Sequence, residues 1–127
     1  MATIDNKATT SQIEFLARLA TATGNAAYAA GAERGLRYLL AAQMPSGGWP
    51  QVFPLQGTYH DQITFNDDAM VRVLIQLRNI KNRKAPWQFV SAGLRTEIEA
   101  ASQRGIQCIL RCQVRVEGIL TAWCAQH

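Results

Sequence analysis

Apolar residues recur every three or four positions along four stretches of the chain, a spacing that places them on one face of an α-helix. Ile13, Leu16 and Ala20 show this spacing in the first stretch, and Ile98 and Ala101 show it in the last. We therefore predict four helices, which run from Thr9 or Thr10 to Gly24, from about Asn25 to Gln43, from Asn66 or Asp67 to the linker Lys81–Pro86, and from about Ser91 to Gln113.

The residues at the ends of these stretches fit helix boundaries. Thr9 can cap the first helix, and Asn66 and Asp67 are both good N-cap residues for the third. Gly24 is suited to the position just after a helix. No stretch has the pattern of a central strand, and we expect Gln51–Phe65 to form at most a short β-hairpin. The predicted fold class is therefore all-α.

A weak internal repeat relates the second helix to the fourth. Arg34–Gln43 aligns with Arg104–Gln113, and each copy is followed by a glycine and a tryptophan: Gly47 and Trp49 in the first, Gly118 and Trp123 in the second. Repeated helical hairpins bury their apolar faces against one another. The repeat predicts part of an α/α toroid, an incomplete ring of hairpins. An open ring exposes apolar surface, so we expect the isolated chain to be marginally stable or to self-associate.

Composition excludes several classes of function. The length of 127 residues suits one domain, and no apolar run is long enough for a transmembrane helix. The net charge is +4, but much of the excess lies in one short loop, Lys81–Lys84, and no nucleic-acid recognition motif accompanies it. The polar N-terminus lacks the apolar core of a signal peptide. The three cysteines have no zinc-ligand spacing, and we expect them to be free and buried.

The segment Gly47–Met70, GGWPQVFPLQGTYHDQITFNDDAM, is the best candidate for a functional site. Long connections in helical domains are usually functional or disordered, and this one is rich in aromatic residues. Asp67 and Asp68 place two carboxylates side by side at a helix start, which suits Ca²⁺. In the alternative, one aspartate caps the helix and the other is solvated. Trp49 and Tyr59 are candidates for sugar stacking, although large aromatic residues more often pack beneath a loop.

These residues carry a resemblance to a known family. GGWPQVFPLQGTYHDQITFNDDAM, with IDNKATTSQIEFLARL, GLRYLLAAQ and GILTAWCAQH, closely resembles the pectate lyases of polysaccharide lyase family 10. The resemblance covers essentially the whole chain. It implies an α/α toroid and calcium-dependent β-elimination of α-1,4-linked polygalacturonate (pectate). It also implies that residues 1–127 are the N-terminal part of a single catalytic domain, truncated at the C-terminus, in a secreted or periplasmic protein.

The family also implies roles for individual residues. An acidic residue of the NDD stretch ligates Ca²⁺, a role that we assign to Asp67 with Asp68 as the alternative. The candidate substrate-binding residues are Trp49, Tyr59, His60 and Asn66. The family's catalytic arginine comes from a later part of the domain, so no catalytic residue is assigned here. A further metal ligand, an aspartate directly after the WCAQH segment, is also absent from this sequence.

Two other functions fit parts of the pattern. A non-catalytic helical module that binds acidic polysaccharide would use the mild positive charge and the aromatic rings. A terpene-cyclase toroid would account for the Gln43-x-x-x-Gly47-x-Trp49 spacing, but the loop around it is polar, whereas such an enzyme needs an aromatic-lined cavity.

Overall fold

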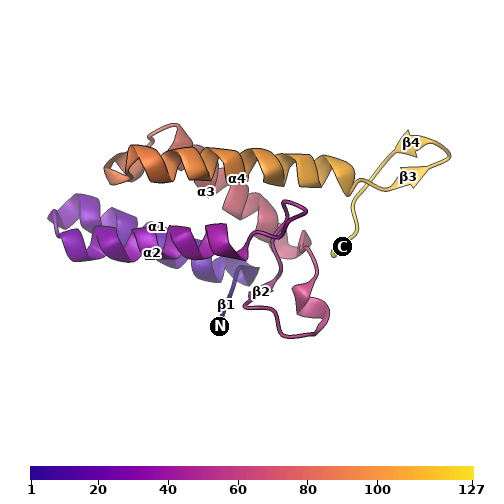
Figure 1. Cartoon of the computed structure of the whole chain (residues 1–127), viewed down its shortest axis with the longest axis horizontal. Helices are drawn as coiled ribbons and strands as arrows, with labels where there is room; N and C mark the ends of the chain where they lie inside the picture. The colour runs from indigo at the N-terminus through magenta and orange to yellow at the C-terminus, as the bar shows by residue number, and fades with distance from the viewer.

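Two antiparallel helical hairpins lie side by side in the computed structural model, which describes residues 1–127 (Figure 1). The first hairpin is formed by α1 (Ala8–Thr23) and α2 (Ala26–Ala42), and the second by α3 (Ala69–Lys81) and α4 (Ala92–Arg111). In Figure 1, α2 and α4 form the near layer, and α1 and α3 lie behind them. The all-α prediction is confirmed, and the arrangement is that of two consecutive hairpins of a partial α/α toroid.

Short-range capping explains three of the helix ends. Asn25 Oδ1 accepts a hydrogen bond from Ala27 N (2.9 Å) before α2, and Ser91 Oγ accepts one from Leu94 N (3.3 Å) before α4. Gly24 ends α1 in the left-handed region, with φ of 68°. These three boundaries agree with the prediction. Four short 3₁₀ turns complete the helical elements: η1 (Asp5–Lys7), η2 (Tyr59–Asp61), η3 (Asn66–Asp68) and η4 (Trp87–Phe89).

The strands are very short and form two separate pairs. β2 (Val52–Phe53) pairs antiparallel with β1 (Ala2–Thr3) at the N-terminus, and within the long loop only an isolated antiparallel bridge joins Pro50 to Ile63. β3 (Arg115–Val116) and β4 (Ile119–Leu120) form a hairpin that projects beyond the end of α4 (Figure 1), which the sequence analysis did not predict. None of the helices is both long and apolar enough to cross a bilayer.

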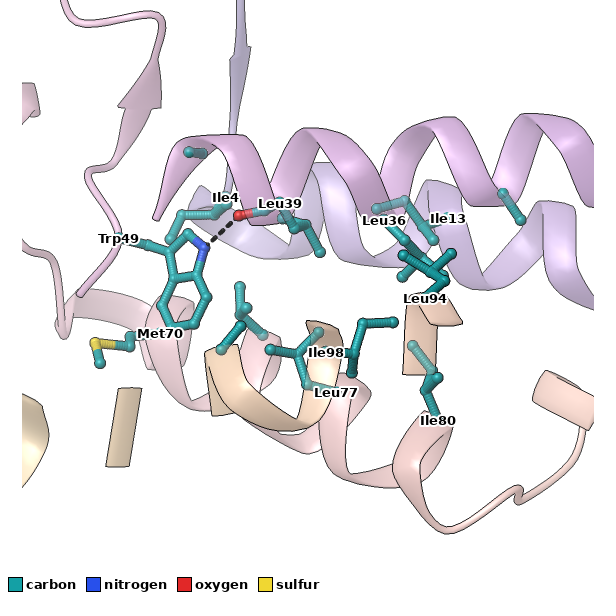
Figure 2. Close-up of a cluster of buried hydrophobic side chains, with 14 of the residues drawn as sticks. Ile4, Ile13, Leu36, Leu39, Trp49, Met70, Leu77, Ile80, Leu94 and Ile98 are labelled. Carbon is teal, nitrogen blue, oxygen red and sulfur yellow. Dashed lines mark hydrogen bonds between the residues drawn. The ribbon is translucent and has the colours of Figure 1, made fainter. Parts of the chain in front are cut away.

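The core lies between the two hairpins (Figure 2). Ile13 and Leu36 of the first hairpin face Leu77, Leu94 and Ile98 of the second, and all five are at most 3 % exposed. Burying each of these side chains stabilises the fold by about 1.5–3 kcal/mol. Most of the core therefore stabilises the contact between the hairpins as well as the hairpins themselves.

The internal repeat is confirmed by equivalent hydrogen bonds. Trp49 Nε1 donates to Leu39 O (2.7 Å, Figure 2), and Trp123 Nε1 donates to Ile109 O (2.8 Å). Leu39 and Ile109 occupy the same position of the aligned helices. We call residues 1–53 the first unit and residues 63–127 the second unit. The tryptophan fixes the loop of each unit to its second helix.

The equivalent glutamines show how the two loops align, and they correct the predicted match of Gly118 to Gly47. Gln43 Nε2 donates to Gly47 O (2.9 Å), and Gln113 Nε2 donates to Thr121 O (3.1 Å). Gly47 and Thr121 therefore occupy equivalent positions, two residues before the tryptophan of each unit.

The cysteines are all free, but they differ in exposure. Cys108 is buried, Cys112 is half-buried and Cys124 is exposed. The prediction of buried, free cysteines is therefore right for Cys108 alone. Burial and the neighbouring Cys112 thiol, 3.9 Å away, raise the pKa of Cys108 to about 11.

Candidate metal and sugar-binding site

The turn η3, which leads into α3, holds both acidic residues of the predicted metal site. Asp67 has φ of 50° and ψ of 34°, and Asp68 has φ of 58° and ψ of 17°, so two consecutive residues are left-handed. Asn and Asp enter this region more readily than other non-glycine residues. Such conformations still cost about 1–3 kcal/mol each, and persist only where surrounding contacts fix them.

The prediction that Asn66 or Asp67 caps the third helix is wrong. α3 begins at Ala69, and no side chain of the preceding turn makes a capping hydrogen bond. Instead, Asn66 Nδ2 donates to Asp67 Oδ2 (2.9 Å), and Arg72 Nη2 lies 3.5 Å from Asp68 Oδ2. Both aspartates are exposed, and the second oxygen of each carboxylate accepts no hydrogen bond from the chain. Neither aspartate side chain caps α3, so the capping alternative does not describe this turn.

Contacts from distant parts of the chain hold η3 in place. Phe65 N and Asn66 N both donate to Ala125 O, at 2.8 and 3.1 Å. Ile63 and His127 exchange a pair of backbone hydrogen bonds of 2.7 and 2.8 Å. The WCAQH segment, Trp123–His127, is thus paired with the residues that lead into η3, including an antiparallel bridge between Thr64 and Gln126. This explains how the turn sustains its unfavourable backbone angles.

The turn η1 is a structural duplicate of η3. Asn6 has φ of 48° and ψ of 32°, and Lys7 has φ of 66° and ψ of 8°, close to the angles of Asp67 and Asp68. The two turns lie next to each other, one at the start of each unit. The left-handed backbone is therefore a property of the repeat, and what distinguishes η3 is its chemistry: Asp68 stands where η1 has Lys7.

Tyr59 and His60 lie on a separate turn of the long loop. Tyr59 is 60 % exposed, and its ring lies against the imidazole of His60, with centroids 3.9 Å apart. His60 Nδ1 lies 3.2 Å from Thr58 Oγ1. No hydrogen bond joins His60 to the Asp61 carboxylate. Tyr59 thus presents an exposed aromatic ring next to an imidazole, a pair that can contact a sugar.

Asp61 stabilises the loop rather than orienting a base. Its Oδ1 accepts a hydrogen bond from Gln56 N (2.8 Å), and its Oδ2 accepts one from Gly57 N (2.6 Å). These bonds, led by the one from Gln56, hold the pKa of the Asp61 carboxyl group below its usual value. The carboxylate therefore closes a tight turn just before Tyr59.

Trp49 is fully buried, and the structure gives it a packing role. Its ring lies against Gly105 of α4, where an added Cβ would approach Trp49 Cζ3 to 2.8 Å. Its indole N–H is bonded to Leu39 O. A ring with no exposed area has no face on which a sugar can stack. The packing alternative of the sequence analysis therefore describes Trp49 in this structure.

The predicted site residues thus form two groups. Asn66, Asp67 and Asp68 lie together on η3, whereas Tyr59 and His60 lie together on η2, and no hydrogen bond joins the two groups. Sequence reasoning missed a polar network beside them: Gln51 Nε2 donates to Asp5 Oδ2 (2.8 Å), and Gln126 Nε2 donates to Gln51 Oε1 (3.2 Å). The similarity of IDNKA to FNDDA was the signal that could have drawn attention to Asp5 and η1.

The donor set of η3 suits a hard cation but is incomplete. Asp67 and Asp68 supply carboxylate oxygens, and the amide nitrogen of Asn66 is the atom bonded to Asp67, so its oxygen remains available. Ca²⁺ takes six to eight oxygen ligands in flexible geometry. No group of three or more acidic, histidine or cysteine side chains surrounds a common point. These residues fit Ca²⁺ as part of a ligand set completed by other oxygens.

Comparison with known proteins places this geometry in one family. The sequence profile of the pectic acid lyase family matches residues 1–127. A family 10 polysaccharide lyase from Cellvibrio cellulosa has 38 % sequence identity and a TM-score of 0.95. An aspartate-to-alanine mutant of that lyase, in complex with trigalacturonic acid, has 37 % identity and the same TM-score. None of the curated proteins compared matches the chain.

The matches cover nearly all of this chain but only part of the solved lyases. They span 99 % of the chain and 40 % of each lyase, so the chain is less than half as long as those structures. The match to the family profile nevertheless extends over every residue. With the fold, the repeat and the η3 turn in agreement, the chain belongs to the pectic acid lyase family of polysaccharide lyases.

Proposed function

We propose that this chain forms part of a calcium-dependent pectate lyase, which cleaves α-1,4-linked polygalacturonate by β-elimination. In this proposal, Asp67 and Asp68 ligate Ca²⁺, and Asn66, Tyr59 and His60 contact the substrate. The observation that carries the proposal is the η3 turn, which presents two exposed carboxylates that do not cap α3, although Asp68 Oδ2 forms a 3.5 Å ion pair with Arg72. The trigalacturonic acid bound to the similar lyase supports an oligogalacturonate as the ligand.

The residues of η3 have distinct tasks in this proposal. Asn66 holds Asp67 in orientation through its 2.9 Å hydrogen bond, and Arg72 pairs with Asp68 Oδ2 at 3.5 Å, which leaves the other oxygen of Asp68 without a partner in the chain. Bound Ca²⁺ would withdraw charge from the uronate carboxylate and so favour loss of the proton at C5. We assign no catalytic base among the residues of this chain.

The same proposal accounts for the separation of the two groups of site residues. A polysaccharide extends over several sugar units, so a metal site on η3 and an aromatic contact on η2 can bind different units of one substrate chain. Because polygalacturonate is a polymer, we further propose that the enzyme acts outside the cytoplasm, as a secreted or periplasmic protein.

Calorimetry with Ca²⁺ tests the metal site directly. Asp67→Ala and Asp68→Ala should each weaken Ca²⁺ binding by about tenfold or more, since losing even an outer-shell partner of a metal site commonly costs that much. Asp5→Asn is the matched control, because Asp5 lies in the duplicate turn η1, and it should leave Ca²⁺ affinity unchanged. Equal Ca²⁺ affinity in the unmodified protein and in all three variants would refute the assignment of Asp67 and Asp68.

Substrate cleavage is tested separately from metal binding. A polypeptide that carries this chain, extended to the length of the solved lyases, is mixed with polygalacturonate at alkaline pH. Absorbance of the unsaturated uronide product should rise, and chelation of Ca²⁺ should abolish the rise. Saturable binding of oligogalacturonate without any product would instead favour a non-catalytic polysaccharide-binding protein.

A further inference from the structure

Gln51, which directly precedes β2 in the long loop, is the residue at which three distant segments of the chain meet. Its backbone carbonyl accepts hydrogen bonds from Ile4 N (3.1 Å) and Thr3 Oγ1 (2.8 Å) at the N-terminus. Its backbone N–H donates to His60 O (2.9 Å) on η2. The half-buried side chain makes two further hydrogen bonds, so every polar atom of Gln51 has a partner.

The side chain of Gln51 joins η1 to the C-terminal segment. Its Nε2 atom donates to Asp5 Oδ2 (2.8 Å), and its Oε1 atom accepts from Gln126 Nε2 (3.2 Å). The Asp5 carboxylate is also held at its other oxygen, because Oδ1 accepts a hydrogen bond from Asn6 N (2.9 Å). This link requires a donor and an acceptor on one side chain, which an amide provides and an ionised carboxylate does not.

Gln126 continues the link to the metal turn η3. Ala125 O, one residue before Gln126, accepts a hydrogen bond from Asn66 N (3.1 Å), and Asn66 Nδ2 donates to Asp67 Oδ2 (2.9 Å). Hydrogen bonds and one peptide linkage therefore connect the amide of Gln51 to the candidate metal ligand Asp67. Because the left-handed backbone of η3 persists only where surrounding contacts fix it, the end of this link at Gln51 matters to the turn.

We propose that Gln51 is a positioning residue for the metal site, whose amide fixes the segment that holds η3. Its backbone N–H fixes η2 at the same time, so both groups of site residues keep one position relative to each other. Because this role concerns Ca²⁺ affinity, it rests on the proposed function. Gln51 acts through Gln126 rather than by contact with the metal or the substrate.

Gln51→Glu breaks the link with little change in the size of the side chain. Glutamate cannot donate to Asp5 Oδ2, so two carboxylates face each other in place of a hydrogen bond. They repel, and the new carboxylate must turn away from Asp5, which displaces the acceptor of Gln126. Ca²⁺ affinity should fall by about threefold to tenfold, the factor to which the loss of one hydrogen bond corresponds.

Adding Asp5→Asn to Gln51→Glu should restore the link. The new amide at position 5 donates to the new carboxylate at position 51, so the hydrogen bond reverses its direction and Gln126 regains its acceptor. Asp5→Asn by itself also keeps the link, because the amides of Gln51 and Gln126 can each rotate and exchange donor for acceptor. Ca²⁺ affinity should therefore recover in the double variant and stay unchanged in Asp5→Asn.

These variants separate positioning from the effect of charge. Gln51→Glu adds a negative charge near the candidate cation site, and Asp5→Asn removes one. Electrostatic attraction alone would therefore raise Ca²⁺ affinity in the first variant and lower it in the second. Positioning predicts a lower affinity in the first variant and no change in the second.

Calorimetric titration with Ca²⁺ tests the proposal on the polypeptide extended to the length of the solved lyases. The unmodified protein is compared with Gln51→Glu, Asp5→Asn and the double variant, and thermal unfolding of each is followed by circular dichroism. Binding should be weakened in Gln51→Glu alone. Gln126→Leu removes the same link from its other end and should weaken binding by a similar factor, so it replaces Gln51→Glu if that variant does not fold.

Three results would overturn the proposal while the proposed function stands, provided that the unmodified protein binds Ca²⁺ and Asp67→Ala loses it. The first is unchanged Ca²⁺ affinity in Gln51→Glu, with or without a lower Tm, which would leave Gln51 at most a structural role. The second is tighter binding in Gln51→Glu, and the third is a double variant that does not recover. If the unmodified protein does not bind Ca²⁺, the proposed function fails, and the role of Gln51 fails with it.

Discussion

Replacing Trp49 with phenylalanine tests how the loop and the second helix stabilise each other. Leu39 contributes one of the last four carbonyls of α2, which have no partner within a regular helix. Gln43 N, which would otherwise approach it, bonds to Leu40 O (3.3 Å) instead. Trp49 Nε1 is therefore the donor that satisfies Leu39 O, at 2.7 Å in a fully buried site.

The expected loss of stability in Trp49→Phe follows from the burial of Trp49. Trp49→Phe leaves a buried acceptor unsatisfied, which costs about 1–3 kcal/mol. The smaller ring also leaves a void against Gly105, for roughly 1–2 kcal/mol, a fraction of the ~3–5 kcal/mol of a Trp→Ala change. We expect the free energy of unfolding to fall by about 3 kcal/mol in total. For a chain of this size that corresponds to a decrease in Tm of roughly 10 °C.

The equivalent tryptophan of the second unit, Trp123, serves as the control. Trp123→Phe removes the equivalent hydrogen bond, 2.8 Å long to Ile109 O, but Trp123 is 44 % exposed and water can replace the lost donor. Its cost should be about 1 kcal/mol or less. Unfolding is followed by far-UV circular dichroism, because each variant lacks one fluorophore. Equal destabilisation by the two substitutions would refute the reasoning that burial decides the value of this bond.

Two further predictions concern ionisable groups. The pKa of Asp61 is lowered in the folded chain, so its carboxylate stabilises the loop at neutral pH and loses this effect as the pH falls through the lowered pKa; Asp61→Asn should remove that acid-dependent change, measured by amide exchange at Gly57. Because the pKa of Cys108 is raised to about 11, its thiol stays protonated at mildly alkaline pH; mass spectrometry should show alkylation first at Cys124 and last at Cys108, and early modification of Cys108 would contradict its burial.

Local chemistry explains which helix boundaries could be predicted. Asn25 and Ser91 accept hydrogen bonds from the first turns of α2 and α4, and Gly24 adopts the left-handed conformation after α1. Each of these depends on residues within three positions. Asp67 misled the prediction because aspartate is favoured both as a helix cap and in the left-handed region. The choice between the two was made by distant contacts to Ala125.

The candidate site likewise has features that the local sequence could predict and features that it could not. The acidic pair at Asp67 and Asp68 was identifiable from residue type and position, and the structure leaves both exposed. The sequence left both sugar stacking and packing open for Trp49, because the residue that encloses its ring, Gly105, lies more than fifty residues further along the chain. The pairing of β2 with the N-terminal strand likewise joins segments about fifty residues apart. No local pattern encodes such contacts.

By itself the sequence determined the helical content, the duplication of the hairpin and the family, because helix periodicity and long motifs are carried by neighbouring residues. Only the tertiary structure decided that Trp49 is enclosed while its equivalent Trp123 is exposed, and that η3 presents both carboxylates instead of capping α3. The physical reason is the same in each case. Burial and left-handed backbone angles are set by the segments that pack against a residue, and those segments are brought together only when the two hairpins fold onto each other.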